Sequence, residues 1–406
     1  MMPDELVDLA VTTLAAGGDG VARDDNGRVT FVPRAAPGDR VRARIVHATS
    51  SFALAELVEV LVPGPSRVPP ACPHVAHGCG GCQWQQVARA EQLAAKHAIV
   101  TGALRKLEGI AIHPVADPAP PLGWRRRARF HVERGRTGLY VLGTQRVLPI
   151  DHCPQLEPAL DAALAVVAAS SPPDGELALV LAHDGKIAVG VERAWRGAHL
   201  VIGRAGIVGS PQGHVLAWRL AGVVVAGESH GETLLEIEPG LWSGPWDFAQ
   251  ASAAGNGALI AQTRAAVGAG PGLLVELYAG TGNLTRGLIA DRWEVIAVDG
   301  VAPQRPPPAR FEVGPVVEIL TRLTGPIDAL VLDPPRAGAA EAIDGIVRLA
   351  PATIVYVSCD PATLARDAGR LVAAGYHASD AWPIDQMPQT SHVEVVMRLV
   401  ARSAHT

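Results

Sequence analysis

Apolar and polar residues alternate along the first part of the chain. The alternation runs through residues 6–23, 28–48 and 52–62, with turn signals that contain glycine or proline between them. A period of two is typical of strands with one buried face, and several short strands in so few residues favour a small barrel. We therefore predict an OB-like β-barrel over residues 1–62, followed by a proline-rich linker.

The pattern changes twice after the barrel. Residues 86–108 carry apolar side chains at helical spacing, and strand-like stretches follow up to about residue 229. From about Trp246, largely apolar stretches that end in Gly, Asp or Pro alternate with helical patterns. Alternating strands and helices predict a parallel sheet with crossover helices. We thus expect a mixed α+β domain over 63–245 and a Rossmann-like α/β domain over 246–406.

Composition limits the classes of protein that fit. The 406 residues are 48% hydrophobic and 18% charged, with a net charge of −5, so a uniformly basic nucleic-acid coat is excluded but a local basic patch is not. No uninterrupted apolar run reaches membrane-spanning length. The acidic N-terminus lacks the basic and apolar regions of a signal peptide. We expect a cytoplasmic monomer that does not contact membranes.

Four of the five cysteines have the spacing of a metal site. Cys72, Cys79 and Cys82 are clustered, and Cys153 lies further along the chain. Thiolates bind soft metals, and either zinc or a [4Fe–4S] cluster takes four of them. Spacing alone does not distinguish zinc from a [4Fe–4S] cluster. The fifth cysteine, Cys359, lies outside this group of four.

A glycine-containing loop in the last segment indicates a nucleotide-like ligand. Gly280 and Gly282 follow an apolar strand, a helical pattern begins after Asn283, and Asp299 ends the next strand. The glycines allow a tight turn against a ligand, and an acid at the next strand end can bind ribose hydroxyls. The single glycine pair favours S-adenosylmethionine over a dinucleotide.

Three further residues lie where strands end or begin at one sheet edge. Asp333 and Cys359 end two strands, and Glu394 lies near the start of a late strand. A thiolate that adds to C6 of uracil makes C5 nucleophilic, so that C5 can attack a sulfonium methyl. A base must then remove the C5 proton before the thiolate leaves. Cys359 is the candidate nucleophile and Glu394 the candidate base.

A basic cluster in the middle segment suggests RNA contact. Arginine and aromatic side chains suit phosphate contact and base stacking. The cluster comprises Arg125, Arg126, Arg127 and Arg129 beside Trp124 and Phe130.

The motifs together resemble the RNA uracil-C5 methyltransferase family, in particular its bacterial iron–sulfur branch that acts on 23S ribosomal RNA. The resemblance covers almost the whole chain and rests on CGGCQWQ, WRRRARF, DHCPQLEP, FAQAS, ELYAGTGNLT, LDPPRAG, VSCDPATLARD and QTSHVEVV, in the family's order. Residues 1–62 are similar to a TRAM domain. The resemblance implies a [4Fe–4S] cluster at Cys72, Cys79, Cys82 and Cys153, nucleophile Cys359 and base Glu394. It implies donor contacts at Gln250, Tyr278, Asn283, Asp299 and Asp333.

The chain departs from the family's pattern at three places. Ser252 stands where Asn is usual, and the first two cluster cysteines are one residue further apart. The helix expected after Asp299 is missing, because three consecutive prolines in residues 301–314 exclude a helix interior. Its donor-contacting Asn would match a position near Gly314.

Three alternatives stay open from the sequence. The first is a methyltransferase that makes 5-methyluridine in transfer RNA. The second is a non-catalytic iron–sulfur RNA-binding protein that has lost donor binding. The third is an amino-methyltransferase, which Arg336 disfavours because such enzymes commonly carry an aromatic residue at this position.

Overall fold

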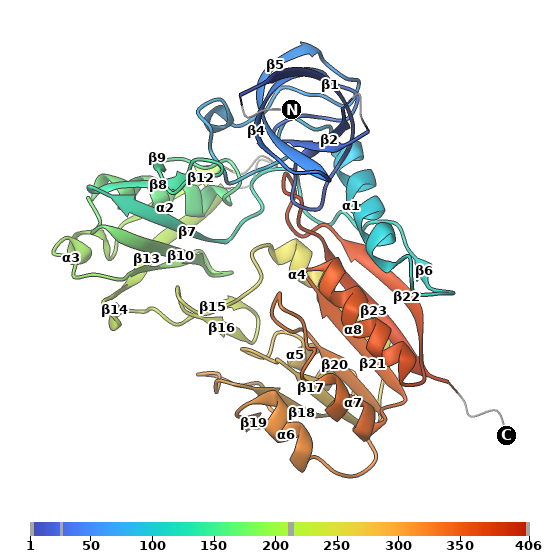
Figure 1. The fold of residues 1–406 in the computed structure, drawn as a ribbon. Helices are drawn as coiled ribbons and strands as arrows, with labels where there is room; N and C mark the ends of the chain where they lie inside the picture. The colour runs from blue at the N-terminus through green and yellow to red at the C-terminus, as the bar shows by residue number, and fades with distance from the viewer. Residues whose placement is uncertain (1–3, 25–26, 210–214, 403–406) are drawn as a thin grey trace. The chain divides into compact units, whose positions relative to one another are not determined.

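The computed structural model describes residues 4–24, 27–209 and 215–402 (Figure 1). The chain divides into two compact units, and neither is one continuous piece of chain. The first unit comprises Met1–Ile99, Leu139–Leu148 and Met387–His392. The second comprises Val100–Gly138, Pro149–Gln386 and Val393–Thr406.

The first unit contains a closed five-stranded barrel, which confirms the predicted N-terminal fold. Its strands are hydrogen-bonded in the order β1-β2-β3-β5-β4. Alternate apolar residues fill the interior, among them Leu9, Val41 and Ile45, while their neighbours face outward. The strands are β1 (Leu6–Leu14), β2 (Gly20–Arg23), β3 (Val29–Val32), β4 (Arg40–Ala48) and β5 (Phe52–Val62). The short 3-10 helix Pro73–Val75 and α1 (Arg89–Leu104) follow.

The middle segment forms a mostly antiparallel sheet with the strand order β12-β13-β11-β10-β7-β8-β9, and β14 pairs with β13. Helix α2 packs against β10, β12 and β13. A separate hairpin, β15–β16, packs through Leu235, Ile237 and Leu241 on residues of β10 and β11. The elements are β7 (Arg127–Glu133), β8 (Arg136–Tyr140), β9 (Val147–Pro149), α2 (Pro158–Ala169), β10 (Gly175–Leu181), β11 (Lys186–Val191), α3 (Ala198–Val201), β12 (Ala205–Gly209), β13 (Val215–Val225), β14 (Glu228–Gly231), β15 (Leu235–Glu238) and β16 (Leu241–Ser243).

The last segment, joined by β6 from the middle segment, forms the predicted α/β sheet, with the strand order β19-β18-β17-β20-β21-β23-β22-β6. Strands β17 to β21 are parallel, and β23 is antiparallel to both β21 and β22. The elements are β6 (Ala111–Ile112), α4 (Ala253–Val267), β17 (Leu273–Leu277), α5 (Thr285–Ala290), β18 (Glu294–Asp299), β19 (Arg310–Val313), α6 (Val316–Arg322), β20 (Ala329–Leu332), α7 (Ile343–Leu349), β21 (Thr353–Ser358), α8 (Pro361–Ala373), β22 (Tyr376–Ile384) and β23 (Glu394–Ala401).

Helices cover both faces of this sheet, because its strands are apolar on both sides. One core joins α6, α7 and α8 to residues such as Val275 and Tyr356, and a second joins α4 and α5 to their neighbours Leu274 and Val355. The strand order reverses at β17, with β18 on one side and β20 on the other. Ligands of open α/β sheets bind at the carboxyl ends of the strands beside such a point.

Two details of the sequence prediction can be checked against these elements. The predicted helix over 86–108 is α1, and no helix lies between Asp299 and Arg310, so β18 connects directly to its parallel neighbour β19. Within the described residues, no helix is long and apolar enough to cross a membrane.

Candidate active site

The glycine loop between β17 and α5 forms the first wall of the site. Tyr278, Gly280 and Gly282 all have positive φ angles, of 62°, 56° and 89°. Apart from the neighbours of Gly280 in the chain, no atom lies within 4 Å of where a Cβ of Gly280 would be. A loop with open space over its glycine fits the close approach of a nucleotide-like donor.

Asp299 ends β18 beside this loop, as predicted. Its Oδ2 accepts a hydrogen bond from the Gly280 N–H at 2.7 Å, and its Oδ1 accepts one from the Val301 N–H at 3.0 Å. The carboxylate therefore fixes the turn and the start of the short connection to β19.

Two carboxyl groups lie near the loop, the buried Glu276 and the partly buried Asp333. Burial raises the pKa of Glu276, on β17, to about 8, and the Thr285 hydroxyl donates to its Oε2 at 2.6 Å. Burial also raises the pKa of Asp333, which follows β20, to about 7. The sequence analysis did not single out Glu276, although its place as the one charged residue in an apolar strand is a visible signal.

Cys359 and Glu394 lie at the same end of two paired strands. Cys359 directly follows β21, and Glu394 is the first residue of β23. Ser358 pairs with Val395 in the antiparallel register, so the next position along places Cys359 opposite Glu394. Opposed residues of antiparallel strands have Cβ atoms roughly 4.5–5.5 Å apart. The fold thus brings the two predicted catalytic residues together.

The surroundings of Cys359 oppose its ionisation. Burial raises the pKa of the thiol to about 11, the carboxylates of Glu394 and Asp333 add to the rise, and Arg336 acts against it. The charges of Glu394, Asp333 and Arg336 therefore all act at the sulfur. Asp360, the next residue, caps α8 by accepting from the N–H groups of Ala362 and Thr363.

Gln250 lies in the irregular segment between β16 and α4. The Arg127 guanidinium donates to the carbonyl oxygens of Pro245, Asp247 and Ala249 and so holds this segment in place. The unusual Ser252 caps α4 by accepting from the Gly255 N–H at 3.0 Å. Asn is an equally good cap residue, so the replacement preserves the start of the helix.

The proposed stacking surface in the arginine cluster is wrong. Trp124 and Phe130 are only 3% and 1% exposed, so neither offers a face to a nucleobase. Arg126 is also buried, and burial lowers the pKa of Arg127 to about 10. Arg129 remains exposed, beside Glu176 and over the ring of Trp246. Within β7, the alternation buries Phe130 and leaves the neighbouring Arg129 exposed.

Three of the cysteines predicted to bind a metal lie in the first unit. The Arg34 guanidinium donates to the carbonyl oxygens of Cys79 and Cys82, and the Gln85 amide contacts the Cys82 Sγ at 3.6 Å. Burial raises the pKa of Cys72. Thiolates are ligands of soft metals, so the chemistry of these side chains suits a soft metal group. Among the described residues, however, no three His, Cys, Asp or Glu side chains converge as ligands of one ion.

The fourth predicted ligand, Cys153, lies in the second unit. Its N–H donates to Asp161 Oδ1 at 2.6 Å.

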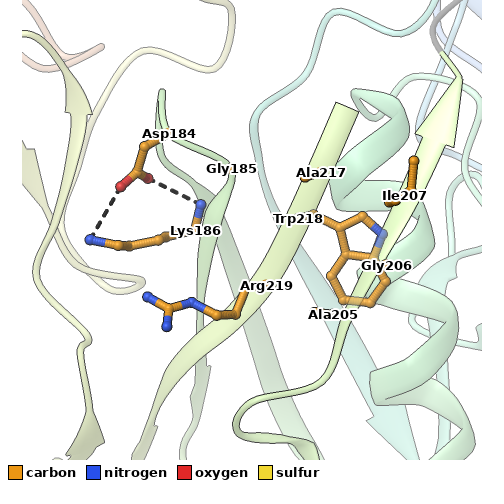
Figure 2. Close-up of a pocket in the computed structure, with 9 residues that line it drawn as sticks. All are labelled: Asp184, Gly185, Lys186, Ala205, Gly206, Ile207, Ala217, Trp218 and Arg219. Carbon is orange, nitrogen blue, oxygen red and sulfur yellow. Dashed lines mark hydrogen bonds and ion pairs between the residues drawn. The ribbon is translucent and has the colours of Figure 1, made fainter. Parts of the chain in front are cut away.

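A hollow of about 530 Å³ lies away from these residues, on the β11–β13–β12 part of the middle sheet (Figure 2). Lys186 lies 3.2 Å from Asp184 and 3.0 Å from Glu232, and Arg219 lies 3.9 Å from Glu232. Because its cations are balanced by carboxylates, this hollow does not present the positive charge that RNA phosphates require.

Comparison with known proteins agrees with the geometry. Residues 4–58 match the family model of the TRAM domain, and residues 324–402 match that of tRNA (Uracil-5-)-methyltransferase. The 23S rRNA (uracil(1939)-C(5))-methyltransferase RlmD of Alkalilimnicola ehrlichii is 32% identical, over 97% of this chain and 96% of that protein. The RlmD of Marinomonas sp. is 33% identical, over 94% and 91%.

One solved structure is similar over almost the entire length. The Pyrococcus abyssi tRNA (uracil-54, C5)-methyltransferase, in complex with S-adenosyl-L-homocysteine, has a TM-score of 0.72 and 18% identity. The match covers 97% of this chain and all of that one. At this identity the similarity establishes the fold.

Proposed function

The chain belongs to the RNA (uracil-5-)-methyltransferase family, and we propose that it methylates C5 of a uridine in 23S ribosomal RNA through a covalent adduct on Cys359. The observation that carries the proposal is the register of β21 and β23. It supports a thiol and a carboxyl group facing each other beside the loop that would hold the methyl donor.

The residues of the site would divide the reaction between them. The Cys359 thiol first loses its proton to solvent, the thiolate adds to C6 of uracil, and the electron pair of the C5–C6 double bond becomes available at C5. When bound, S-adenosylmethionine would supply the electrophilic methyl group that C5 takes, and it would leave as S-adenosylhomocysteine. Glu394 then removes the C5 proton, the double bond re-forms, and the C6–S bond breaks to release the thiolate.

The remaining site residues would hold the donor. We assign this role to Gln250, Tyr278, Gly280, Gly282, Asn283, Asp299 and Asp333, which lie at or beside the carboxyl ends of β17, β18 and β20 or in the segment before α4. The side-chain amide of Asn283 is already engaged by Asn256, so we expect its contribution to come through the shape of the loop. Protonated Asp333, whose pKa is about 7, could donate a hydrogen bond to a bound group.

We propose in addition that Cys72, Cys79, Cys82 and Cys153 bind one metal group. Four thiolates are the ligand set of a [4Fe–4S] cluster and also of a structural zinc. The resemblance to the iron–sulfur branch favours the cluster. Its role would be structural, because Cys359 supplies the nucleophile, and the reaction would take place in the cytoplasm.

Covalent trapping tests the chemistry. Fluorine at C5 cannot leave as a proton, so wild-type protein with donor should remain attached to 5-fluorouridine RNA. Cys359→Ala should form no adduct and no product, whereas Glu394→Gln should accumulate a methylated adduct on ordinary RNA. Its turnover should fall roughly a hundredfold to ten-thousandfold, the contribution of a positioned acid–base group. Adducts that persist in Cys359→Ala, or full turnover in Glu394→Gln, would contradict these roles.

A second assay distinguishes the alternative substrates. The TM-score of 0.72 to a transfer-RNA enzyme keeps transfer RNA as the second candidate. Mapping 5-methyluridine in ribosomal and transfer RNA from a deletion strain should show loss of one site in 23S RNA. Loss of a transfer-RNA site alone would show that the substrate is transfer RNA and not 23S RNA. No loss, together with no donor binding, would favour the non-catalytic RNA-binding alternative.

A further inference from the structure

The side chain of Asn283 in the glycine loop is held by a residue outside it. Its Nδ2 donates to the Oδ1 of Asn256 at 2.7 Å, and its Oδ1 accepts from the Asn256 Nδ2 at 2.8 Å. Asn256 lies in the first turn of α4 and is 1% exposed. A buried, reciprocal pair of amides satisfies both groups and fixes both orientations.

Asn256 is in turn held by the tip of the β15–β16 hairpin. Its Nδ2 also donates to Glu238 Oε1 at 3.0 Å. The Glu238 carboxylate forms an ion pair with Arg286, which follows the glycine loop in α5, and lies 3.7 Å from Arg126. Arg286 donates a second hydrogen bond, of 2.8 Å, to the carbonyl oxygen of Pro239 in the hairpin turn. The tip therefore supports the α5 end of the loop, directly through Arg286 and indirectly through Asn256.

The same hairpin contacts the short connection that replaces the missing helix. The Arg305 guanidinium lies 3.8 Å from the centre of the Trp242 ring, on β16. Two residues later, Pro307 packs against the glycine loop, because a Cβ at Gly282 would come within 2.6 Å of its Cδ. The connection thus contacts both the glycine loop and the hairpin.

We propose that the β15–β16 hairpin is a positioning element for the methyl donor, with Glu238 and Trp242 as its contact residues. Glu238 orients Asn256 and through it Asn283, and Trp242 holds Arg305 and the connection over Gly282. The hairpin replaces the support that a helix after Asp299 would give. This inference rests on the proposed function, since it assumes that the loop binds S-adenosylmethionine.

The first test measures the donor dissociation constant by titration calorimetry on the full chain. Asn256→Asp places a second carboxylate against Glu238 and removes a donor to Asn283. The dissociation constant should rise roughly tenfold to a hundredfold, as expected for a buried hydrogen-bonding group left unsatisfied. Adding Glu238→Gln removes the repulsion and should recover part of the loss. Glu236→Gln, on the same strand, keeps the side-chain oxygen that accepts from the Gly240 N–H at 2.7 Å and removes only the charge beside His183, so it should leave the affinity unchanged.

The second test uses the exposed Arg305 and the half-buried Trp242. Arg305→Ala and Trp242→Ala should each weaken donor binding roughly twofold to fivefold, the range of an exposed cation–π contact. The double variant should lose no more than either single one, because both remove the same contact. RNA affinity and the unfolding temperature without donor should stay at wild-type values in all three.

Normal donor binding in both Asn256→Asp and Arg305→Ala would overturn the inference. The inference would also be overturned if the losses of donor affinity in Arg305→Ala and Trp242→Ala added fully in the double variant. Failure of the proposed function looks different, because wild-type protein itself would then bind no donor or form no 5-methyluridine.

Discussion

Cys359 has a local environment that keeps its sulfur protonated in the free protein. Burial is the main cause of the raised pKa of the thiol, and the negative charges of Glu394 and Asp333 add to it. Arg336 is the neighbouring charge that favours the thiolate, while it also lies 3.5 Å from the carboxylate of Asp360. Arg336, which follows the paired prolines, therefore favours the thiolate form that the proposed reaction needs.

The pH dependence of alkylation measures this balance. With a pKa of about 11, the thiolate fraction of Cys359 increases with pH through the whole range from 7 to 10. Reaction with iodoacetamide should therefore continue to accelerate above pH 9, as followed by mass spectrometry of the Cys359 peptide.

Two variants should shift the alkylation profile in opposite directions. Glu394→Gln removes a negative charge and should speed alkylation at pH 8 roughly threefold to tenfold, and Arg336→Ala should slow it by a similar factor. Equal rates in all three proteins would show that these charges do not act at the sulfur.

The turn after β20 depends on a buried network beneath it. Asp367, on α8, accepts hydrogen bonds of 2.8 Å from the Tyr356 hydroxyl and from the Ala339 N–H. Gly338 precedes Ala339 with a φ of 82°, and a Cβ there would come within 2.5 Å of the Asp367 carboxylate. The network thus fixes the backbone that carries Asp333 and Arg336.

Gly338→Ala should destabilise the fold by about 2 kcal/mol, because it combines a strained φ with displacement of a buried carboxylate. The measurement is the free energy of unfolding from urea denaturation. Gly369→Ala, in α8 with no atom near the added Cβ, is the matched control and should stabilise slightly. If the two variants have equal stability, the turn tolerates a side chain.

The sequence predicted a site residue well where that residue directly follows an apolar strand. Apolar strands followed by Asp333 and Cys359 mark the carboxyl edge of a parallel sheet, and the fold places them there. The contacts of Arg126 could not be predicted in this way, since its partner Glu238 lies far along the chain. The hairpin that contacts the glycine loop was missed for the same reason, because its role depends on tertiary pairing rather than on local pattern.

The path of the chain links the two units at the candidate base. The turn between β22 and β23 contributes Met387–His392 to the first unit, and Glu394 follows two residues later. Within that unit, the Lys96 Nζ donates to the Met387 carbonyl oxygen at 3.2 Å, and the Gln92 Nε2 donates to the Gln389 Oε1 at 2.9 Å. The Trp84 N–H, two residues after Cys82, donates to the Gln389 carbonyl oxygen at 3.0 Å. The cysteine segment therefore shares a hydrogen-bond network with the turn that leads into β23.

Metal analysis of the whole protein tests the proposed cysteine group. Protein purified without oxygen should be brown and contain about four iron and four sulfide per chain, the composition of a four-thiolate cubane. Cys79→Ser and Cys153→Ser should each lose most of the iron. Cys359→Ser is the matched control, since it removes a thiol that is not a proposed ligand, and it should retain the full iron content.

The outcomes separate the possible groups. One zinc without sulfide would replace the cluster by a structural zinc. A full iron content in Cys153→Ser would show that Cys153 is not a ligand of the metal group. Because Trp84 lies beside the cysteine segment and bonds to the turn before Glu394, loss of iron should also lower the unfolding temperature of the protein. An unchanged unfolding temperature in Cys79→Ser would show that the metal group does not support this network.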